Sequence, residues 1–510
     1  MTTQRGQRQH HALLRHSAGE LLTNLGSGSM SETAYDTAWV ARVQDPRTSG
    51  PAFPTAFDWL IQHQFPDGSW GGVIPVLHDR VVSTLISAIT LAERPGTQHA
   101  GAVARAVAYL APALVRLDQD VAETVGFELI MPTLLARAQQ LRLALPYERC
   151  TSIYDLRADK LRRLPIGFVY SGPSPLTHSL EFLGDEFQPD LARRSQAPNG
   201  SFAASPSATA YFLMHQWDEP AAAYLRAVVA LSAAGAACDV FPFEVFEKGW
   251  VLSHLGPLAQ QVRGYRRRLA ELARAWSPIG VGFTSSAIVP DGDDTAIVFR
   301  VLHGGGYAVQ PNVFRLFEAD DYFFTFPLER NQSVSTNAHV LHGLQDYGDF
   351  PGRERMIGKA ITFLRASRLP GGMWRDKWHA SPYYATGRVI LALAGADESA
   401  GELVGPAVDW LVETQHENGS WSAFQRSGTC EETAYALQAL ASLPQPSRSA
   451  LTAMARASGY LWERLDTWDF PELWVGKGLY APHAVIRAAI LGALYAYERV
   501  EAIFQAPNAS

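Results

Sequence analysis

A short pattern that recurs four times constrains the fold more than any other feature of the chain. The two best copies are residues 64–70 (QFPDGSW) and 415–421 (QHENGSW), and residues 196–202 and 369–374 carry weaker ones. Each copy follows apolar residues at helical spacing, and its Asp-Gly or Asn-Gly pair suits the positive φ at which many helices end. An ordinary turn between two helices explains one copy but not four. The pattern, together with the scarcity of strand-like alternation, predicts an almost entirely α-helical protein.

Three carboxylates lie within four residues at Asp291-Gly-Asp293-Asp294. Like charges this close cannot all ionise cheaply, so at least one carboxyl is favoured to stay protonated at neutral pH. A protonated carboxyl in an apolar cavity is a strong acid, of the kind needed to protonate an alkene. Asp clusters also cap helices, and this motif alone leaves both interpretations open. A calcium loop is excluded, because Leu302 stands where that loop needs a glutamate.

Several motifs together resemble one family. The acid motif continues into Thr295-Ala296 and resembles the D-x-D-D-T-A motif of class II terpene cyclases, and the recurring pattern resembles the Q-W repeats of their helical barrels. Further segments that fit the family lie at residues 31–41, 205–210, 376–384, 431–435 and 473–480. The chain is therefore identified as a member of the class II terpene cyclases, which include diterpene and rarer sesquiterpene cyclases related to squalene-hopene cyclase.

The resemblance implies an all-α fold of two α-barrels in the βγ arrangement. Residues 49–258 are expected to form the γ-type barrel, and residues 259–510 the β-type barrel that carries the acid motif. The segment 19–48 is expected to be an N-terminal helix that packs on the second barrel. Residues 1–18 are polar and rich in His, Arg and Gln, and we expect a disordered arm there. The remaining length leaves no room for a third, class I domain.

The resemblance also implies the reaction, that of an isomerase of the intramolecular lyase type. Such an enzyme protonates the terminal alkene of a prenyl diphosphate and retains the diphosphate. Geranylgeranyl diphosphate and a bicyclic labdane-type product are expected, with conversion of farnesyl diphosphate to drimenyl diphosphate as the alternative. Asp293 is the implied proton donor, tuned by Asp291 and Asp294. Ser333 and Asn337 keep an i, i+4 spacing and are expected to bind the donor, with His339 as the alternative partner.

The diphosphate requires cationic donors and, in this family, Mg²⁺. The motif around Lys160 makes that lysine the first choice, and Glu128 matches an acid that lies at the diphosphate and the metal. Asp118 and Asp120 are candidate auxiliary metal ligands, although a solvated loop is the simpler interpretation. Further candidate substrate-binding lysines are Lys248 and Lys477.

Aromatic faces stabilise a carbocation without attacking it. Phe283, Trp378 and Tyr383 are the candidates for this role. His178 matches a histidine that works with an asparagine as terminal base in plant ent-copalyl synthases, but Asp239 stands in place of that asparagine. This departure leaves the product skeleton open.

Composition excludes several classes of protein. The formal net charge of −7 and a pI of about 6.1 argue against nucleic acid as a partner. No apolar run reaches the ~18–20 residues of a membrane span. Three isolated cysteines and an N-terminus without an apolar signal segment predict a cytoplasmic protein. The product would pass to a downstream class I terpene synthase or a phosphatase, and a homodimer is left open.

Other classes of helical protein fit less well. A protein prenyltransferase subunit needs Asp, Cys and His on one zinc ion, and the cysteines here are isolated. A class I terpene synthase needs D-D-x-x-D, and Asp320-Asp321 is followed by Phe324 at the last position. A non-catalytic helical scaffold does not explain the acid motif, and incubation with prenyl diphosphates separates it from an enzyme.

Overall fold

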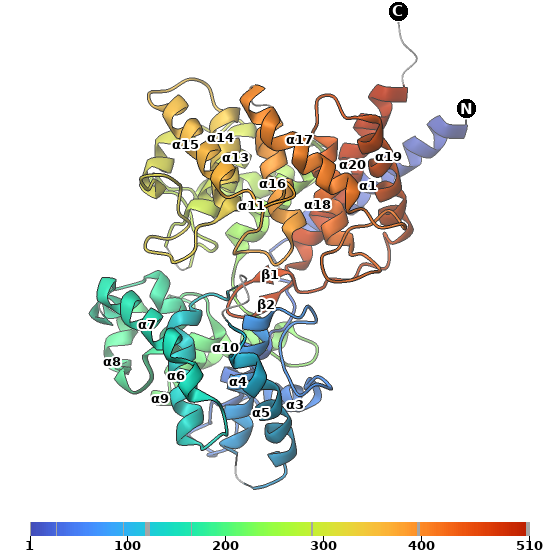
Figure 1. The fold of residues 1–510 in the computed structure, drawn as a ribbon. Helices are drawn as coiled ribbons and strands as arrows, with labels where there is room; N and C mark the ends of the chain where they lie inside the picture. Colours follow the sequence, from blue (N-terminus) through green and yellow to red (C-terminus); the bar gives the residue numbers. More distant parts are fainter. Residues whose placement is uncertain are drawn as a thin grey trace, which may run out of the picture.

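The protein was analysed as a computed structural model, which describes residues 2–26, 28–94, 96–117, 123–164, 166–286, 289–394 and 398–505. These residues form two helical lobes with a short two-stranded sheet between them (Figure 1). The predicted all-α fold of two α-barrels is therefore confirmed. No helix in the described ranges is long and apolar enough to cross a membrane.

The C-terminal barrel is a closed double ring. Neighbouring helices of the inner ring contact each other until the ring closes, and these are α11 (Glu244–Leu255), α13 (Gly292–Gly304), α14 (Val334–Asp346), α16 (Pro382–Leu393), α18 (Cys430–Ala441) and α20 (His483–Gln505). The outer layer consists of α1 (Thr2–Asn24), α12 (Tyr265–Ala275), η7 (Pro311–Phe317), α15 (Arg353–Ala366), α17 (Glu398–Glu413) and α19 (Arg448–Glu463). The rings enclose one large hydrophobic core.

The N-terminal barrel repeats this plan on a smaller scale. Its inner ring consists of α2 (Ala34–Ala41), α4 (Leu77–Ala92), α6 (Phe127–Gln140), the 3₁₀ segment η4 (Pro175–Glu186) and α9 (Pro206–His215). Around it lie α3 (Pro54–Gln62), α5 (Ala100–Leu114), α7 (Thr151–Arg163), α8 (Pro189–Ala192) and α10 (Glu219–Leu231). Further short 3₁₀ segments lie between these helices, namely η2 (Tyr147–Arg149), η3 (Ile166–Tyr170), η5 (Arg193–Ser195) and η6 (Gly256–Gln261).

The two best copies of the recurring pattern have the same local hydrogen bonds. In both best copies the glutamine amide donates to the carbonyl of the turn glycine, at 3.0 Å in Gln64 and 2.9 Å in Gln415. The indole N–H of Trp421 donates to the carbonyl of Leu411 at 2.8 Å, which ties the turn to the preceding helix. The Trp421 backbone N–H donates to the Thr433 hydroxyl in the next helix. Each repeat thus joins an outer helix to the inner helix that follows it.

Local sequence explains where the inner helices begin. The side chains of Ser333, Ser381 and Thr429 accept a backbone N–H from the first turns of α14, α16 and α18. Pro382 then occupies the first helical position of α16, where its missing N–H costs nothing. These caps fix the ends of the helices near the interface of the two barrels.

The predicted domain boundaries differ from the structure at three places. The prediction of a disordered arm over residues 1–18 is wrong, because residues 2–18 lie in α1, whose Leu14 and Ala18 are fully buried in the C-terminal core. Inside the segment 19–48, α2 packs in the N-terminal barrel and not on the second one. Inside the segment 49–258, α11 belongs to the inner ring of the C-terminal barrel.

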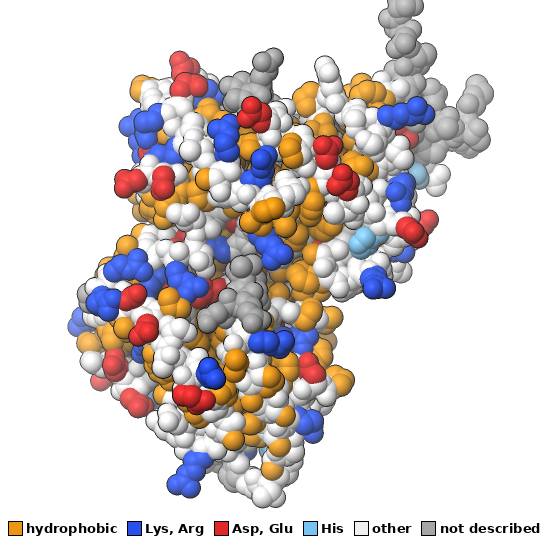
Figure 2. All heavy atoms as spheres, in the orientation of Figure 1, with side chains coloured by type: hydrophobic (Ala, Val, Ile, Leu, Met, Phe, Trp, Pro, Cys, Tyr) orange, Lys and Arg blue, Asp and Glu red, His pale blue; other side chains and the backbone are white. Residues whose placement is uncertain are grey.

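The two barrels meet at the hairpin of β1 (Trp474–Val475) and β2 (Leu479–Tyr480), whose strands are antiparallel with Trp474 opposite Tyr480. Figure 1 shows this hairpin between the lobes. Positive and negative side chains are interspersed over both lobes on the face shown in Figure 2. That face carries no broad basic surface of the kind that nucleic acid selects.

Candidate active site

The acid motif begins the first turn of α13, inside the C-terminal barrel. The Asp291 side chain caps this helix and accepts the backbone N–H groups of Asp293 at 3.0 Å and Asp294 at 2.7 Å. All three carboxyl side chains are buried. The helix-cap interpretation is therefore correct for Asp291, and the cap leaves Asp293 and Asp294 free for other contacts.

Burial raises the pKa of two of these carboxyls. Desolvation, and then the nearby Asp294 charge, hold the pKa of Asp291 well above its usual value. Burial raises the pKa of Asp294 to about 7, although a hydrogen bond from Asp291 and the nearby Trp250 indole work against the rise. Protons are thus retained in this cluster at neutral pH.

His339 on α14 is the direct partner of Asp293. Its Nδ1 lies 2.6 Å from Oδ1 of Asp293, and both side chains are buried. The Trp250 ring packs edge-on against the imidazole, with the ring centroids 5.0 Å apart. A short, buried contact of this kind positions one carboxyl oxygen and leaves the other, Oδ2, for a second partner.

The expected partners Asn337 and Ser333 do not bind the acid, and this prediction is wrong. The Asn337 amide donates to the carbonyls of Phe323 and Ser333 and accepts the Phe323 N–H at 2.8 Å. Ser333 caps α14 and donates to Asp376 at 2.9 Å. Asn337 thus holds α14 against the loop that carries Phe323, and Ser333 ties the start of α14 to Asp376, whereas the alternative partner His339 contacts Asp293.

Aromatic side chains surround the acid, and most of them were missed from the sequence. Trp250, Tyr384 and Trp474 pack against one another, with ring centroids 5.2–6.1 Å apart. Burial, and then the nearby Asp293 carboxyl group, raise the pKa of the Tyr384 phenol. Trp474 lies in a family motif of the sequence, which was the one available signal for it. These π faces suit a carbocation.

The predicted aromatic residues have different positions. Trp378 donates its indole N–H to Thr325 at 3.1 Å, and the carbonyl of Thr325 accepts the N–H of Gly292 in the acid motif. Phe283 packs edge-on against His178, with centroids 6.1 Å apart. Tyr383 is wrong as a cation-stabilising residue, because it stacks on Trp410 of the outer helix α17 at 4.8 Å.

Lys160 and Glu128 come together at the interface of the barrels, as expected for a shared diphosphate site. Lys160 Nζ lies 3.3 Å from Glu128 Oε1 and donates to the carbonyl of Leu328 from the other barrel at 2.8 Å. Leu328 is three residues from Thr325, so at most roughly 11 Å of backbone separates this contact from the contact with the acid motif. One loop therefore connects the acid to the lysine.

Glu123 is a further acid at this interface. Its Oε2 accepts from Arg330 at 2.7 Å and from Asn331 at 2.8 Å, whereas its buried Oε1 has no hydrogen-bond partner among the described residues. Burial, followed by the charge of Glu128, raises the pKa of Glu123. The predicted metal ligands Asp118 and Asp120 lie outside the described residues. Within the described ranges, no group of three or more His, Cys, Asp or Glu side chains is arranged to hold a metal ion.

One of the predicted substrate lysines is wrong. Lys477 is fully buried, and its Nζ donates to the carbonyl of His178 at 2.8 Å and to Glu181 at 3.1 Å, so its ammonium is not accessible to a diphosphate. Lys248 lies 3.1 Å from Glu271 and ties α11 to α12, and its role in substrate binding stays a prediction.

His178 and Asp239 lie on either side of Lys477. Asp239 is wrong as a substrate-binding residue, because it accepts the backbone N–H groups of Lys477 and Gly478 and thereby fixes the hairpin turn. The His178 ring packs at a steep angle against Phe283, and its Nδ1 hydrogen-bonds with the carbonyl of Ala203 at 3.0 Å. Burial and the Lys477 charge lower the pKa of His178 to about 3, so its ring is neutral at physiological pH.

Comparison with known proteins decides the family. Residues 328–463 match the model of the squalene-hopene cyclase C-terminal domain. A type B diterpene cyclase of Mycobacterium tuberculosis is 35% identical over 491 residues, covering 92% of this chain and 96% of its own. The chain belongs to the class II terpene cyclase family. The resemblance inferred from its motifs is thus confirmed.

A solved structure agrees with this assignment. The ent-copalyl diphosphate synthase from Streptomyces platensis superposes with a TM-score of 0.79 at 31% identity, over 96% of this chain and all of that one. The ent-copalyl diphosphate synthase AN1 of Zea mays is 34% identical, but the aligned part is 44% of its length. The cyclase described here therefore spans less than half of that plant relative.

Proposed function

We propose that this cyclase protonates the terminal alkene of geranylgeranyl diphosphate and converts it to a bicyclic labdane-type diphosphate. The observation that carries the proposal is the buried Asp293 carboxyl, paired with His339 at 2.6 Å among aromatic rings. Diterpene cyclase and copalyl diphosphate synthase relatives support a C20 substrate.

Asp293 supplies the proton. His339 Nδ1–H donates to Oδ1, so the acidic proton of Asp293 resides on Oδ2 and passes to the terminal alkene carbon as a C–H bond forms. The tertiary cation is attacked by the next alkene while Trp250, Tyr384 and Trp474 offer only π faces. A proton is lost in the last step, which restores neutrality to the hydrocarbon part. The Asp293 carboxylate that remains is stabilised by the same imidazole N–H.

Asp291 and Asp294 hold protons close to the donor. The raised pKa of Asp291 keeps it protonated at neutral pH, and its hydrogen bond to Asp294 lowers the pKa of the latter. Low charge in the cluster matters because an additional carboxylate beside Asp293 would weaken it as an acid.

The diphosphate end would bind at the interface of the barrels, beside Lys160. The orphan oxygen of Glu123 and the neighbouring Glu128 fit Mg²⁺, which is held by one or two carboxylates plus waters and phosphate oxygens. When bound, Mg²⁺ neutralises the charge of the diphosphate. The diphosphate remains covalently attached throughout, because it serves only to hold the substrate in position.

The experiment is incubation of purified enzyme and of the Asp293→Asn variant with geranylgeranyl and farnesyl diphosphate. The amide keeps the shape of the acid but cannot donate a proton to carbon, so cyclised product should vanish while the melting temperature holds. Mass spectrometry after phosphatase treatment identifies the products. Substantial cyclisation by the variant refutes the role of Asp293, and faster turnover of farnesyl diphosphate refutes the C20 substrate.

A further inference from the structure

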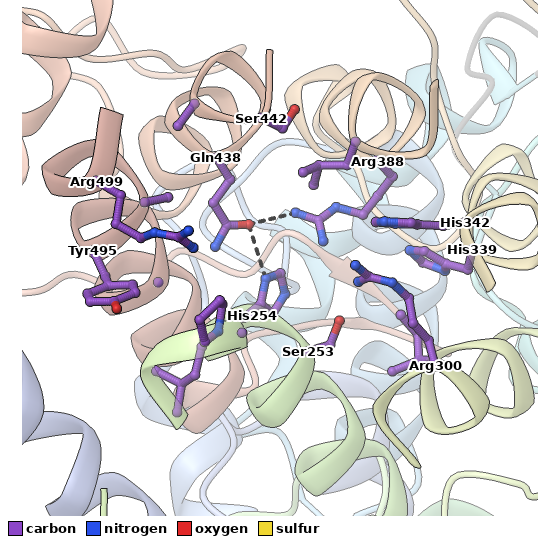
Figure 3. Close-up of a pocket in the computed structure, with 18 of the residues that line it drawn as sticks. Ser253, His254, Arg300, His339, His342, Arg388, Gln438, Ser442, Tyr495 and Arg499 are labelled. Carbon is purple, nitrogen blue, oxygen red and sulfur yellow. Dashed lines mark hydrogen bonds between the residues drawn. The ribbon is translucent and has the colours of Figure 1, made fainter. Parts of the chain in front are cut away.

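A cavity of about 200 Å³ lies inside the C-terminal barrel, and all six inner helices contribute to its wall. His339 lines it, so the cavity adjoins the acid pair (Figure 3). Its volume is below the range of pockets that take large organic ligands, which excludes a C15 or C20 prenyl chain. A small polyatomic ion fits.

The wall of this cavity is cationic. Three guanidinium groups line it, and Figure 3 shows Arg300, Arg388 and Arg499 approaching the centre from different sides. The residues that form the wall include no Asp or Glu. Arg300 lies 2.6 Å from Asp346, which neutralises it in part. The cavity as a whole retains an excess of positive charge.

Arg388 is the residue most in need of a counterion. It is 6% exposed, its guanidinium donates to Oε1 of Gln438 at 2.9 Å, and it lies over the rings of Tyr384 and Tyr435. Its Nε has no hydrogen-bond partner in the described part of the chain. A buried charge without a carboxylate or other anion is costly. An anion in the cavity removes that cost.

The hydrogen-bonding state of His254 indicates which kind of anion the cavity can bind. Gln438 donates its amide to the carbonyl of Ala489, so its Oε1 must accept, and the contact of 3.3 Å with Nδ1 of His254 is therefore an N–H donation. Burial and the Arg388 charge hold the pKa of His254 well below its usual value, so the ring is neutral. Its buried Nε2 then carries a lone pair, and it has no partner among the described residues.

We propose that this cavity binds one hydrogen phosphate ion, with its oxygens on the guanidinium groups of Arg388, Arg300 and Arg499 and its P–OH donating to Nε2 of His254. Hydrogen phosphate carries the hydroxyl that the His254 lone pair requires. Sulfate has the same shape but no proton at neutral pH, so its oxygen would face that lone pair. The site is separate from the prenyl diphosphate site and does not depend on the proposed function.

The test is isothermal titration calorimetry of the full chain in a low-chloride buffer at neutral pH, without prenyl substrate. Inorganic phosphate should bind saturably at one site per chain, and sulfate at the same ionic strength roughly tenfold or more weakly. Arg300→Gln and Arg499→Gln should each weaken phosphate binding by roughly tenfold. These two are less buried than Arg388, so they avoid the folding defect that an Arg388 variant risks.

The control variant is Arg274→Gln, an exposed arginine on α12 whose contact is with its own helix. It should bind phosphate like the wild type. A folded wild type that gives no saturable phosphate binding overturns the site and leaves a cavity filled with water. Unchanged phosphate affinity in both Arg300→Gln and Arg499→Gln also overturns the site. Sulfate binding as tight as phosphate binding overturns the assignment to hydrogen phosphate.

Discussion

The donor Asp293 owes its position to single contacts on two helices. Asp291 fixes the start of α13 by accepting two backbone N–H groups, and His339 on α14 holds Oδ1 of the donor. The proposed function requires Asp293 to be an acid strong enough to protonate an alkene. Burial, a fixed imidazole and protonated neighbours together favour that role.

His339→Gln should lower kcat by roughly 10²–10³-fold with little change in KM, because the amide cannot position and stabilise Asp293 as the imidazole does. Asn337→Ala is the matched comparison on the same helix. It removes three buried hydrogen bonds, two to Phe323 and one to Ser333, so its main effect should be a lower melting temperature. Steady-state kinetics and thermal unfolding separate the two, and a fully active His339→Gln enzyme contradicts the assignment.

Asp294→Asn should change how stability depends on pH. The folded pKa of Asp294 is raised to about 7 by burial, so the folded state binds this proton more tightly than the unfolded state. The wild type therefore loses stability as pH rises from about 4, the unfolded value, to about 7. The asparagine variant lacks this loss, so its melting temperature relative to that of the wild type should rise between pH 5 and pH 8. A constant difference across that range shows that Asp294 ionises normally.

The acid motif could be identified in the sequence, but the residue that contacts Asp293 could not. Asn337 and His339 lie two residues apart on α14, so their side chains point about 200° apart around the helix. Which of them meets α13 depends on how the two helices pack, and the motif does not encode that. The aromatic residues Trp250 and Tyr384 were missed for the same reason, since each looks like ordinary core packing in the sequence.

At the scale of elements, the barrels are joined by a hairpin whose turn carries a buried lysine. Lys477 pairs with Glu181 of η4 and donates to Ser205 and Ser207 at the start of α9. Asp239 holds the turn from the other side. The turn of the hairpin is therefore part of the N-terminal barrel's polar interior, although Lys477 lies 270 residues along the chain from Ser207.

Lys477→Met should destabilise the protein by about 3–5 kcal/mol, because it leaves Glu181 buried without its partner. Arg226→Met is the control. Arg226 pairs with Glu219 on the exposed surface of α10, where the loss of an ion pair has little effect. Urea unfolding followed by circular dichroism measures both. Equal midpoints for Lys477→Met and Arg226→Met would show that the buried pair contributes no stability.

The recurring pattern predicted the helical barrels because its hydrogen bonds are local, within a turn and the helices beside it. The assignment of helices to barrels was less predictable. Each of α2 and α11 follows a loop that passes from one lobe to the other, and long-range contacts decide which barrel each helix joins. Nothing in the local sequence at residues 34–41 or 244–255 shows which core they enter.

For the whole molecule, the important relation is between the acid in one barrel and the interface with the other. The loop from Thr325 to Leu328 contacts Gly292 beside the acid at one end and Lys160 at the other. A substrate whose alkene reaches Asp293 and whose diphosphate reaches Lys160 thus spans both barrels. The proposed function therefore requires the two barrels to keep a fixed relative position.

Lys160→Ala should raise KM for the prenyl diphosphate by roughly tenfold or more, because it removes a charged contact to the diphosphate. Lys248→Ala is the matched lysine control, since Lys248 pairs with Glu271 between α11 and α12. Its KM should stay at the wild-type value. Steady-state kinetics on both variants decides the matter, and an unchanged KM for Lys160→Ala means that the diphosphate binds elsewhere.

The central claim is that an acid of this chain protonates the hydrocarbon end of a substrate whose diphosphate stays attached. The most direct measurement is mass spectrometry of the intact product formed from geranylgeranyl diphosphate in D₂O. The account predicts a cyclised diphosphate that has gained one deuterium on carbon and lost one hydrogen, with no deuterated product from Asp293→Asn. Release of free pyrophosphate in step with a product that carries no deuterium would contradict it.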